Sequence, residues 1–305
     1  MQRVRLMAAC AIASLSLASP VVAQRAAAPT GTLERIRAAG AIKLGYRVDA
    51  RPFSFQDESG AAAGYTVALC QKVAEAIKTD LGLTAMTVTW VPVTLADRFA
   101  AVQRGDVDLL CGAESVTLER RKDVAFSVPV FPGGIGALLR TDAPPRLREV
   151  LNERPRTDPT WRGSAGQLLQ EQTFSVVTGT TAEPWLARKL TEFKLTARVT
   201  PVDGYDPGIQ GVVDRKASVF FADRAILLDA SRRHPQAGRL QVLDRLFTYE
   251  PVALVLRRGD EDFRLTVDRA LSVFYASGEL NGLYVQWFGE ADENARNFFR
   301  WNALQ

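Results

Sequence analysis

Hydrophobic and polar positions along this chain follow two periodicities in turn, one typical of helices and one of strands. Between residues 64 and 81, apolar side chains such as Val67, Cys70 and Ile77 recur every three or four positions, which predicts a helix with one buried face. Ile42, Leu44 and Tyr46 alternate with other residues, which predicts a strand. In this part of the chain the same reasoning predicts helices at 33–40 and 95–104 and strands at 86–91 and 107–110.

A similar alternation resumes after a proline-rich, charged stretch at 144–161, which we expect to be a surface excursion. Strands that alternate with helices favour an α/β fold with mostly parallel sheets covered on both faces. Such sheets bind ligands beyond the carboxyl ends of their strands, here 47–55, 112–120, 179–181 and the turn at Asp223. The predicted strands of the second half are 174–177, 199–202, 219–222 and 252–256, and the helices are 182–193, 224–233, 262–277 and 281–288.

The N-terminus predicts export. Arg3 and Arg5 precede an apolar run from Leu6 to Leu17, and small residues lead up to a cleavage site before Gln24. The run of 12 residues is shorter than the ~20 that span a bilayer. We therefore expect residues 1–23 to be a cleaved signal peptide and the protein to be periplasmic.

Composition narrows the function classes. The signal removes two of the 38 basic residues and none of the 34 acidic ones, so the mature chain carries 36 against 34, a net charge of +2. Such a nearly balanced charge does not indicate a protein that binds nucleic acid, which typically carries a clear excess of basic residues. A single histidine, His234, with two mature cysteines excludes a Cys/His zinc site and a Ser-His-Asp triad. In an oxidising compartment, Cys70 and Cys111 form either a disulfide or two buried thiols that never meet.

Several strand-end segments combine groups that suit a charged small molecule. After the strand at 107–110, backbone N–H groups, Ser115 and Arg120 come together, and Arg offers a planar fork to a carboxylate. Gly179 precedes a helix start that suits an anion, and Asp223 at a strand end could take an ammonium group. The ordinary alternatives are solvated charges for the first segment and helix capping for the other two, with Thr180 or Thr181 as one cap. Arg47 and Arg98 taken singly are typical surface ion-pair partners.

Taken in order, short segments along the chain resemble the periplasmic amino-acid-binding family of ABC importers (bacterial extracellular solute-binding protein family 3), above all its glutamate/aspartate-binding members. They run from about residue 32 to 290, and their ordered set is more specific than any single piece. The matching segments are Gly45-Tyr46-Arg47, Pro52-Phe53-Ser54-Phe55, Gly64-Tyr65, Val93-Thr94 with Arg98, Gly105-Asp106-Val107-Asp108-Leu109, Cys111-Gly112, Glu119-Arg120-Arg121-Lys122, Ala125-Phe126-Ser127, Gly179-Thr180-Thr181, Phe221-Ala222-Asp223, and Gly278 with Trp287-Phe288-Gly289.

The resemblance implies a two-lobed periplasmic-binding-protein fold (type II), in which each lobe is a mostly parallel sheet flanked by helices. Lobe 1 would comprise 24–132 and 252–305, and lobe 2 would comprise 133–251, with hinges near 132–135 and 249–252. It also implies a monomer that binds a free amino acid, without cofactor or metal, and delivers it to the membrane permease subunits of an ABC importer.

By position in the family, Arg120 would hold the α-carboxylate, supported by Ser115 and by N–H groups near Ala113 and Thr180 or Thr181. Asp223 would take the α-ammonium group. Arg47 and Arg98 match the positions that hold a side-chain carboxylate, and their charge surplus favours glutamate or aspartate as the ligand. Phe53 and Tyr205, the latter at a histidine position, complete the expected ligand-binding set.

Some residues depart from the family pattern. Ala113 lacks the hydroxyl of those binders, Leu95 replaces a small polar residue, and Glu114 adds an acid that we expect to point outward. Two other functions stay open beside ligand delivery without catalysis. One is a periplasmic lyase or dehydratase on the same scaffold, with Glu114 as its acid. The other is a sensory module that acts in trans on a membrane partner.

Overall fold

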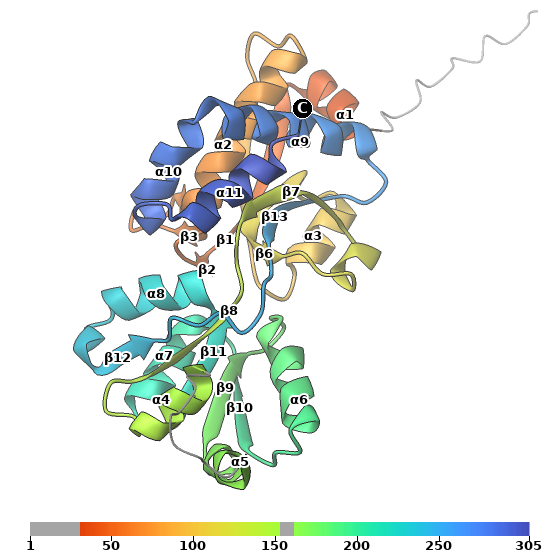
Figure 1. The fold of residues 1–305 in the computed structure, drawn as a ribbon. Helices are drawn as coiled ribbons and strands as arrows, with labels where there is room; N and C mark the ends of the chain where they lie inside the picture. The colour runs from red at the N-terminus through yellow and green to blue at the C-terminus, as the bar shows by residue number, and fades with distance from the viewer. Residues whose placement is uncertain (1–30, 153–161, 305) are drawn as a thin grey trace, which may run out of the picture.

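A computed structural model describes residues 31–152 and 162–304, with the side chains of 162–164 left aside. Two five-stranded sheets lie one above the other, and each is flanked by helices (Figure 1). The predicted two-lobed α/β fold is therefore confirmed. The predicted signal peptide at 1–23 lies outside the described residues.

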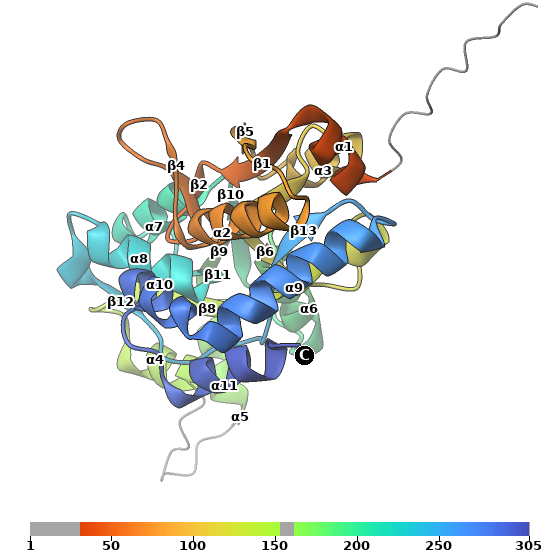
Figure 2. The ribbon, with the colours of Figure 1, turned by 90° about the horizontal axis from the view of Figure 1, so that it is seen from above.

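The first sheet, in the upper lobe of Figure 1, carries helices on both faces. On one face α2 (Tyr65–Asp80) packs beside α9 (Glu261–Ser277), as Figure 2 also shows. The other face is covered by α3 (Arg98–Arg104), whose Val102 joins a buried cluster with Leu110 and Val255. In spatial order the strands are β5 (Thr87–Val93), β1 (Ala41–Arg47), β6 (Leu109–Ser115), β13 (Val252–Leu256) and β7 (Ala125–Phe131).

The second sheet repeats this arrangement. Alternate residues of its central strand face opposite layers, so Phe220 packs on one side while Phe221 packs on the other. The strands in spatial order are β10 (Arg198–Val202), β9 (Thr173–Val177), β11 (Val219–Asp223), β8 (Ile135–Arg140) and β12 (Leu240–Val242). The helices are α4 (Pro145–Asn152), α5 (Arg162–Gln170) and α6 (Ala182–Glu192) along one face, and α7 (Tyr205–Val213) and α8 (Arg224–Arg233) on the other.

One strand in each sheet, β8 or β13, runs antiparallel to its neighbours. Both strands come directly after the chain has crossed from one lobe to the other. A strand that enters a lobe from the crossing runs away from the gap between the lobes, whereas the remaining strands run toward it. Four strands of each sheet therefore direct their carboxyl ends at the space between the lobes, where ligands bind in open α/β sheets.

The two crossings lie side by side and are hydrogen-bonded to each other. Glu250 donates its backbone N–H to the carbonyl of Gly133 at 2.8 Å. Ile135 N–H donates to the hydroxyl of Thr248 at 2.9 Å. At Gly134 the approach is so close that a Cβ atom would lie 2.1 Å from the Thr248 carbonyl oxygen. Only glycine fits there, because any side chain would push the crossings apart.

The disulfide alternative for the two mature cysteines is confirmed. Cys70 on α2 is bonded to Cys111 on β6, with Cα atoms 6.1 Å apart and a sequence separation of 41. The bond ties a covering helix to the central strand of the first sheet, directly before the segment that we singled out for anion binding.

Every strand and helix predicted by periodicity is present, with shifts at the ends. The largest shift concerns β6, which begins at Leu109 and continues to Ser115, so the first four residues of the predicted anion loop at 112–120 are strand. The region 47–55, predicted as loop, contains strands of a small three-stranded sheet, and the predicted surface excursion includes α4. The elements not yet named are α1 (Thr32–Ala39), β2 (Asp49–Ala50), β3 (Ser54–Gln56), β4 (Ala62–Ala63), α10 (Glu279–Phe288) and α11 (Glu293–Asn302).

No helix within 31–152 or 162–304 is long and apolar enough to cross a membrane. Within the same ranges, no cluster of three or more His, Cys, Asp and Glu side chains could hold a metal ion.

Candidate functional site

A cavity lies between the carboxyl ends of the two sheets, and its lining comes from both lobes and both crossings. Nine of the ten predicted ligand-binding residues line it, although they are spread over almost 180 positions of sequence. These nine residues are Arg47, Arg98, Ala113, Ser115, Arg120, Thr180, Thr181, Tyr205 and Asp223.

Phe53 is the predicted residue that does not line this cavity. It is fully buried in the core of the first lobe, where its ring centre lies 4.9 Å from that of Phe131 and 5.5 Å from that of Phe288. Its neighbour Ser54 instead serves the site, because it accepts the backbone N–H of Arg47 at 2.8 Å. Phe53 therefore anchors the small sheet beside the site.

Arg120 reaches the cavity from the turn after β6. Its Nη1 donates to the carbonyl of Ser115 at 2.8 Å, and its guanidinium lies 5.3 Å from the ring centre of Phe99. These contacts orient the side chain without neutralising it. Within 31–152 and 162–304, no carboxylate lies within ion-pair distance of Arg120, so its charge is available for an anion that enters the cavity.

Asp223 ends β11 on the opposite side of the cavity. One carboxylate oxygen accepts the backbone N–H groups of Ala225 and Ile226 at 2.9 and 3.2 Å, so the residue caps α8, as one of our two alternatives predicts. Burial raises the pKa of Asp223 to about 6. In the part of the chain that the structure describes, no Lys, Arg or His forms an ion pair with it.

The start of α6 forms a third wall. Thr181 is the N-cap residue, but its side chain makes no capping bond; its hydroxyl donates to the carboxylate of Glu250 at 2.5 Å. The Thr180 hydroxyl donates to the carbonyl of Val177 at 2.7 Å. The first N–H groups of a helix have no acceptor within it and attract anions, so this end of α6 suits a carboxylate.

Glu114 overturns one of our expectations. It does not point outward but is 1% exposed and lines the cavity between two arginines. Its Oε2 accepts Arg98 Nε at 2.6 Å, and its Oε1 lies 3.4 Å from Arg47 Nη1. Burial alone would raise the pKa of Glu114, but the positive charges of the arginines outweigh it and lower that pKa. The acid therefore stays ionised within the site.

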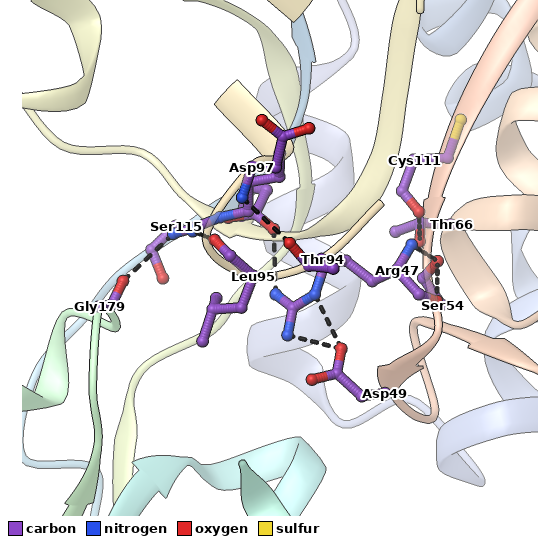
Figure 3. A network of polar contacts seen from close by, with 12 residues as sticks. Arg47, Asp49, Ser54, Thr66, Thr94, Leu95, Asp97, Cys111, Ser115 and Gly179 are labelled. Atoms are coloured by element: carbon purple, nitrogen blue, oxygen red, sulfur yellow. Dashed lines mark hydrogen bonds and ion pairs between the residues drawn. The ribbon is translucent and has the colours of Figure 1, made fainter. Parts of the chain in front are cut away.

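Arg47 and Arg98 are engaged by the protein on other sides as well. Arg47 Nε donates to Asp49 at 2.8 Å, a contact that Figure 3 shows together with Ser54. Arg98 donates to the carbonyl of Leu95 and, from the first lobe to the second, to the carbonyl of Gly179 at 3.2 Å. Both arginines reach the predicted place, but neither is as free as Arg120.

Other lining residues were not predicted as ligand contacts, namely Glu114, Leu95, Gly134, Ile135, Ala182 and Glu250. Glu250 changes the charge of the cavity most, because it adds a third carboxylate to those of Glu114 and Asp223. It lies in the second crossing, where the sequence carries no strand-end signal. Tyr205, which was predicted, lies at the start of α7, and burial raises its pKa to about 12.

The sequence profile of the bacterial extracellular solute-binding proteins, family 3, matches residues 42–290. The chain belongs to this family. An L-glutamate/L-aspartate-binding protein of Pseudomonas aeruginosa is 31% identical over 279 residues, which cover 91% of this family 3 protein and 85% of that relative. A glutamate/aspartate import solute-binding protein of Escherichia coli is 25% identical over 282 residues, with 92% and 87% covered.

Solved structures of amino-acid-binding proteins share the fold of this family 3 protein. An ancestral amino-acid-binding protein, described as a precursor of cyclohexadienyl dehydratase, superposes with a TM-score of 0.68 at 24% identity, covering 85% of this chain and 99% of that one. A receptor for L-cysteine from Neisseria gonorrhoeae gives a TM-score of 0.67 at 23% identity, covering 86% and 98%. At these identities the likeness concerns the fold alone.

Proposed function

We propose that this protein binds a free L-amino acid in the periplasm and delivers it to the permease subunits of an ABC importer. The observation that carries the proposal is a single cavity that contains the guanidinium of Arg120, without an ion-pair partner among the described residues, and the capping carboxylate of Asp223. An amino acid brings the matching carboxylate and ammonium group on a single carbon atom. The family supports this proposal, as do the two relatives, which are glutamate/aspartate-binding proteins.

In this proposal Arg120 binds the α-carboxylate of the ligand. The N–H groups at the start of α6 donate to the same carboxylate. Asp223 accepts from the α-ammonium group, and Glu250 adds negative charge beside it. Because Arg120 belongs to the first lobe and Asp223 to the second, an α-amino acid connects the lobes. Ligand contacts made only when the lobes are together favour the closed form.

We also propose that lobe 1 comprises 24–132 and 252–305 and that lobe 2 comprises 133–251. The paired crossings would be the hinge. We also propose that residues 1–23 are removed on export and that the mature protein acts as a monomer.

Glutamate or aspartate is the side-chain class that the relatives support. The expected preference for an acidic side chain depends on a surplus of positive charge in the cavity, and Glu114 and Glu250 remove that surplus. The cavity is lined by three arginines and three carboxylates, namely Arg47, Arg98, Arg120, Glu114, Asp223 and Glu250. The α-amino-acid proposal does not depend on that balance, whereas the choice of side chain does.

Catalysis is disfavoured by the state of Glu114. A dehydratase needs a carboxylic acid that can give up and regain a proton near the working pH. Two arginines hold the Glu114 carboxylate and lower its pKa, which makes it a poor general acid. The relatives are binding proteins by name. We therefore propose ligand delivery rather than lyase activity, and the sensory alternative has no observation in its favour.

The test is calorimetry of the mature protein against the twenty common amino acids, with mass spectrometry of any ligand released on denaturation. We expect at least one amino acid to bind with micromolar or tighter affinity. The proposal fails if none binds and no amino acid is released.

A further inference from the structure

Glu114 is the one lining carboxylate that ion-pairs with two other lining residues. It extends from β6 so that one oxygen lies 2.6 Å from Arg98 Nε and the other 3.4 Å from Arg47 Nη1. All three residues are at most 5% exposed. By the family resemblance, Arg47 and Arg98 would hold a side-chain carboxylate of the ligand, whereas in this structure they hold a carboxylate of the protein itself.

We propose that Glu114 is a specificity-determining residue: it fills the anionic part of the side-chain subsite, so that the cavity selects an amino acid with an uncharged amide side chain, glutamine or asparagine, over glutamate and aspartate. This inference rests on the proposed function, because it concerns the side chain of the same ligand.

The charges around the side-chain subsite disfavour an acidic ligand. Around the side-chain subsite, Arg47 and Arg98 are matched by Glu114 and Asp49, which lies 2.7 Å from Arg47 Nη2. A glutamate ligand would add a further negative charge to a place that is already neutral. A buried charge without a partner is costly, and two carboxylates that share a site oppose each other's ionisation. An uncharged side chain meets neither cost.

The donors and acceptors of the side-chain subsite favour a primary amide. Arg47 Nη2 is buried and, despite its closeness to Asp49, has no aligned acceptor in the part of the chain that the structure describes. An ionised Glu114 can accept further N–H groups beyond those from Arg98 and Arg47. A primary amide offers both an acceptor oxygen and N–H donors, so it can satisfy Arg47 and Glu114 together. A carboxylate offers only acceptors.

The decisive experiment is a competition between isosteric ligands on the mature wild-type protein. Calorimetry gives the dissociation constants of glutamine, asparagine, glutamate and aspartate at pH 7.5. We expect the better amide to bind at least tenfold more tightly than the better acid. Equal affinity, or tighter binding of either acid, overturns the role of Glu114 and leaves amino-acid binding intact. If none of the twenty amino acids binds, the proposed function itself fails and the inference falls with it.

Two variants assign the selectivity to the charge. Glu114→Gln keeps the shape and removes the charge, so the preference for amide over acid should fall at least tenfold. Glu114→Asp keeps the charge and should retain the amide preference even if both affinities fall. Circular dichroism establishes that each variant is folded, and the wild-type competition decides the proposal if Glu114→Gln does not fold. An unchanged preference in a folded Glu114→Gln variant contradicts the proposal.

Discussion

Arg120 and Asp223 line the same cavity from opposite lobes, and neither has an ion-pair partner among the described residues. Other charged groups of the cavity, such as Arg98 and Glu114, neutralise each other. The charges of Arg120 and Asp223 are therefore available to a ligand, whereas those of Arg98 and Glu114 are already paired within the protein.

Arg120→Ala should weaken amino-acid binding at least 100-fold. Loss of one partner from a buried, hydrogen-bonded charge pair typically costs about 2–5 kcal/mol. Calorimetry measures the affinity, and circular dichroism should show an unchanged fold, since Arg120 forms no ion pair with any residue that the structure describes. Arg121→Ala is the matched control, because the neighbouring side chain is exposed and should leave the affinity unchanged. Equal effects of the two variants would refute the assignment.

Binding should weaken in mild acid. The ammonium group needs an ionised Asp223, whose pKa is raised to about 6 by burial. At pH 5 about a tenth of such a carboxyl is ionised, so the apparent affinity should be about tenfold lower than at pH 7.5. Calorimetry across this range measures the effect. An affinity that stays constant between pH 7.5 and 5 would remove Asp223 from the ammonium site.

The ligand-free protein should show the opposite trend. The folded-state pKa of Asp223 exceeds the ordinary value of 3.8, so the fold binds this proton more tightly than the unfolded chain does. Its contribution to stability is therefore complete below about pH 4 and is lost as the pH rises through about 6. Urea unfolding of Asp223→Asn against wild type should isolate this contribution, because the amide cannot titrate.

Reduction of the disulfide between Cys70 and Cys111 should lower the free energy of unfolding by about 4 kcal/mol, because the bond closes a loop of 41 residues in the unfolded chain. Urea unfolding with and without a reductant measures the difference. The double variant Cys70→Ser with Cys111→Ser should be insensitive to the reductant. Two free thiols in the denatured, unreduced mature protein would contradict the bond.

Gly134→Ala should disturb both stability and ligand affinity. A Cβ atom would meet the Thr248 carbonyl at 2.1 Å, so the two crossings must separate. We expect a loss of about 1–3 kcal/mol in unfolding free energy, as for other overpacked sites, together with weaker binding. Gly238→Ala is the control, because nothing lies within 4 Å of its Cβ position. A tolerated Gly134→Ala would show that the paired crossings can accommodate a Cβ atom at this position.

Most elements were predictable because their burial is regular. Helix α8 and strand β13 match the predicted bounds since each has a clear apolar pattern and clear ends. Strands β2, β3, β4 and β12 were missed, because strands of two or three residues carry no periodicity. The longer strands β7 and β8 were missed too, because their buried positions do not alternate with exposed ones. Helices α4, α5, α7 and α11 were missed as well. The apolar face of α11 consists of only a few residues, and one of them, Phe299, packs on Tyr275 of α9 and Tyr284 of α10.

The candidate site was predictable in position but not in charge. Strand ends and the family resemblance placed Arg120 and Asp223 correctly beside one cavity. The predicted orientation of Glu114 was wrong, because β6 continues further than expected. Glu114 therefore lies in a strand rather than a loop, and the strand decides which way its side chain points. A shift in the end of a strand thus changed the predicted charge balance of the ligand pocket.

The place of β13 between β6 and β7 has a consequence for the order in which the protein forms. All five strands of the second sheet are present once residue 242 has been synthesised, whereas β6 and β7 lack the strand that joins them until 252–256 emerge. The N-terminal half therefore cannot complete its core on the ribosome before the chain is nearly finished. If the protein is exported as we propose, this delay keeps the first lobe unfolded while the chain leaves the cytoplasm.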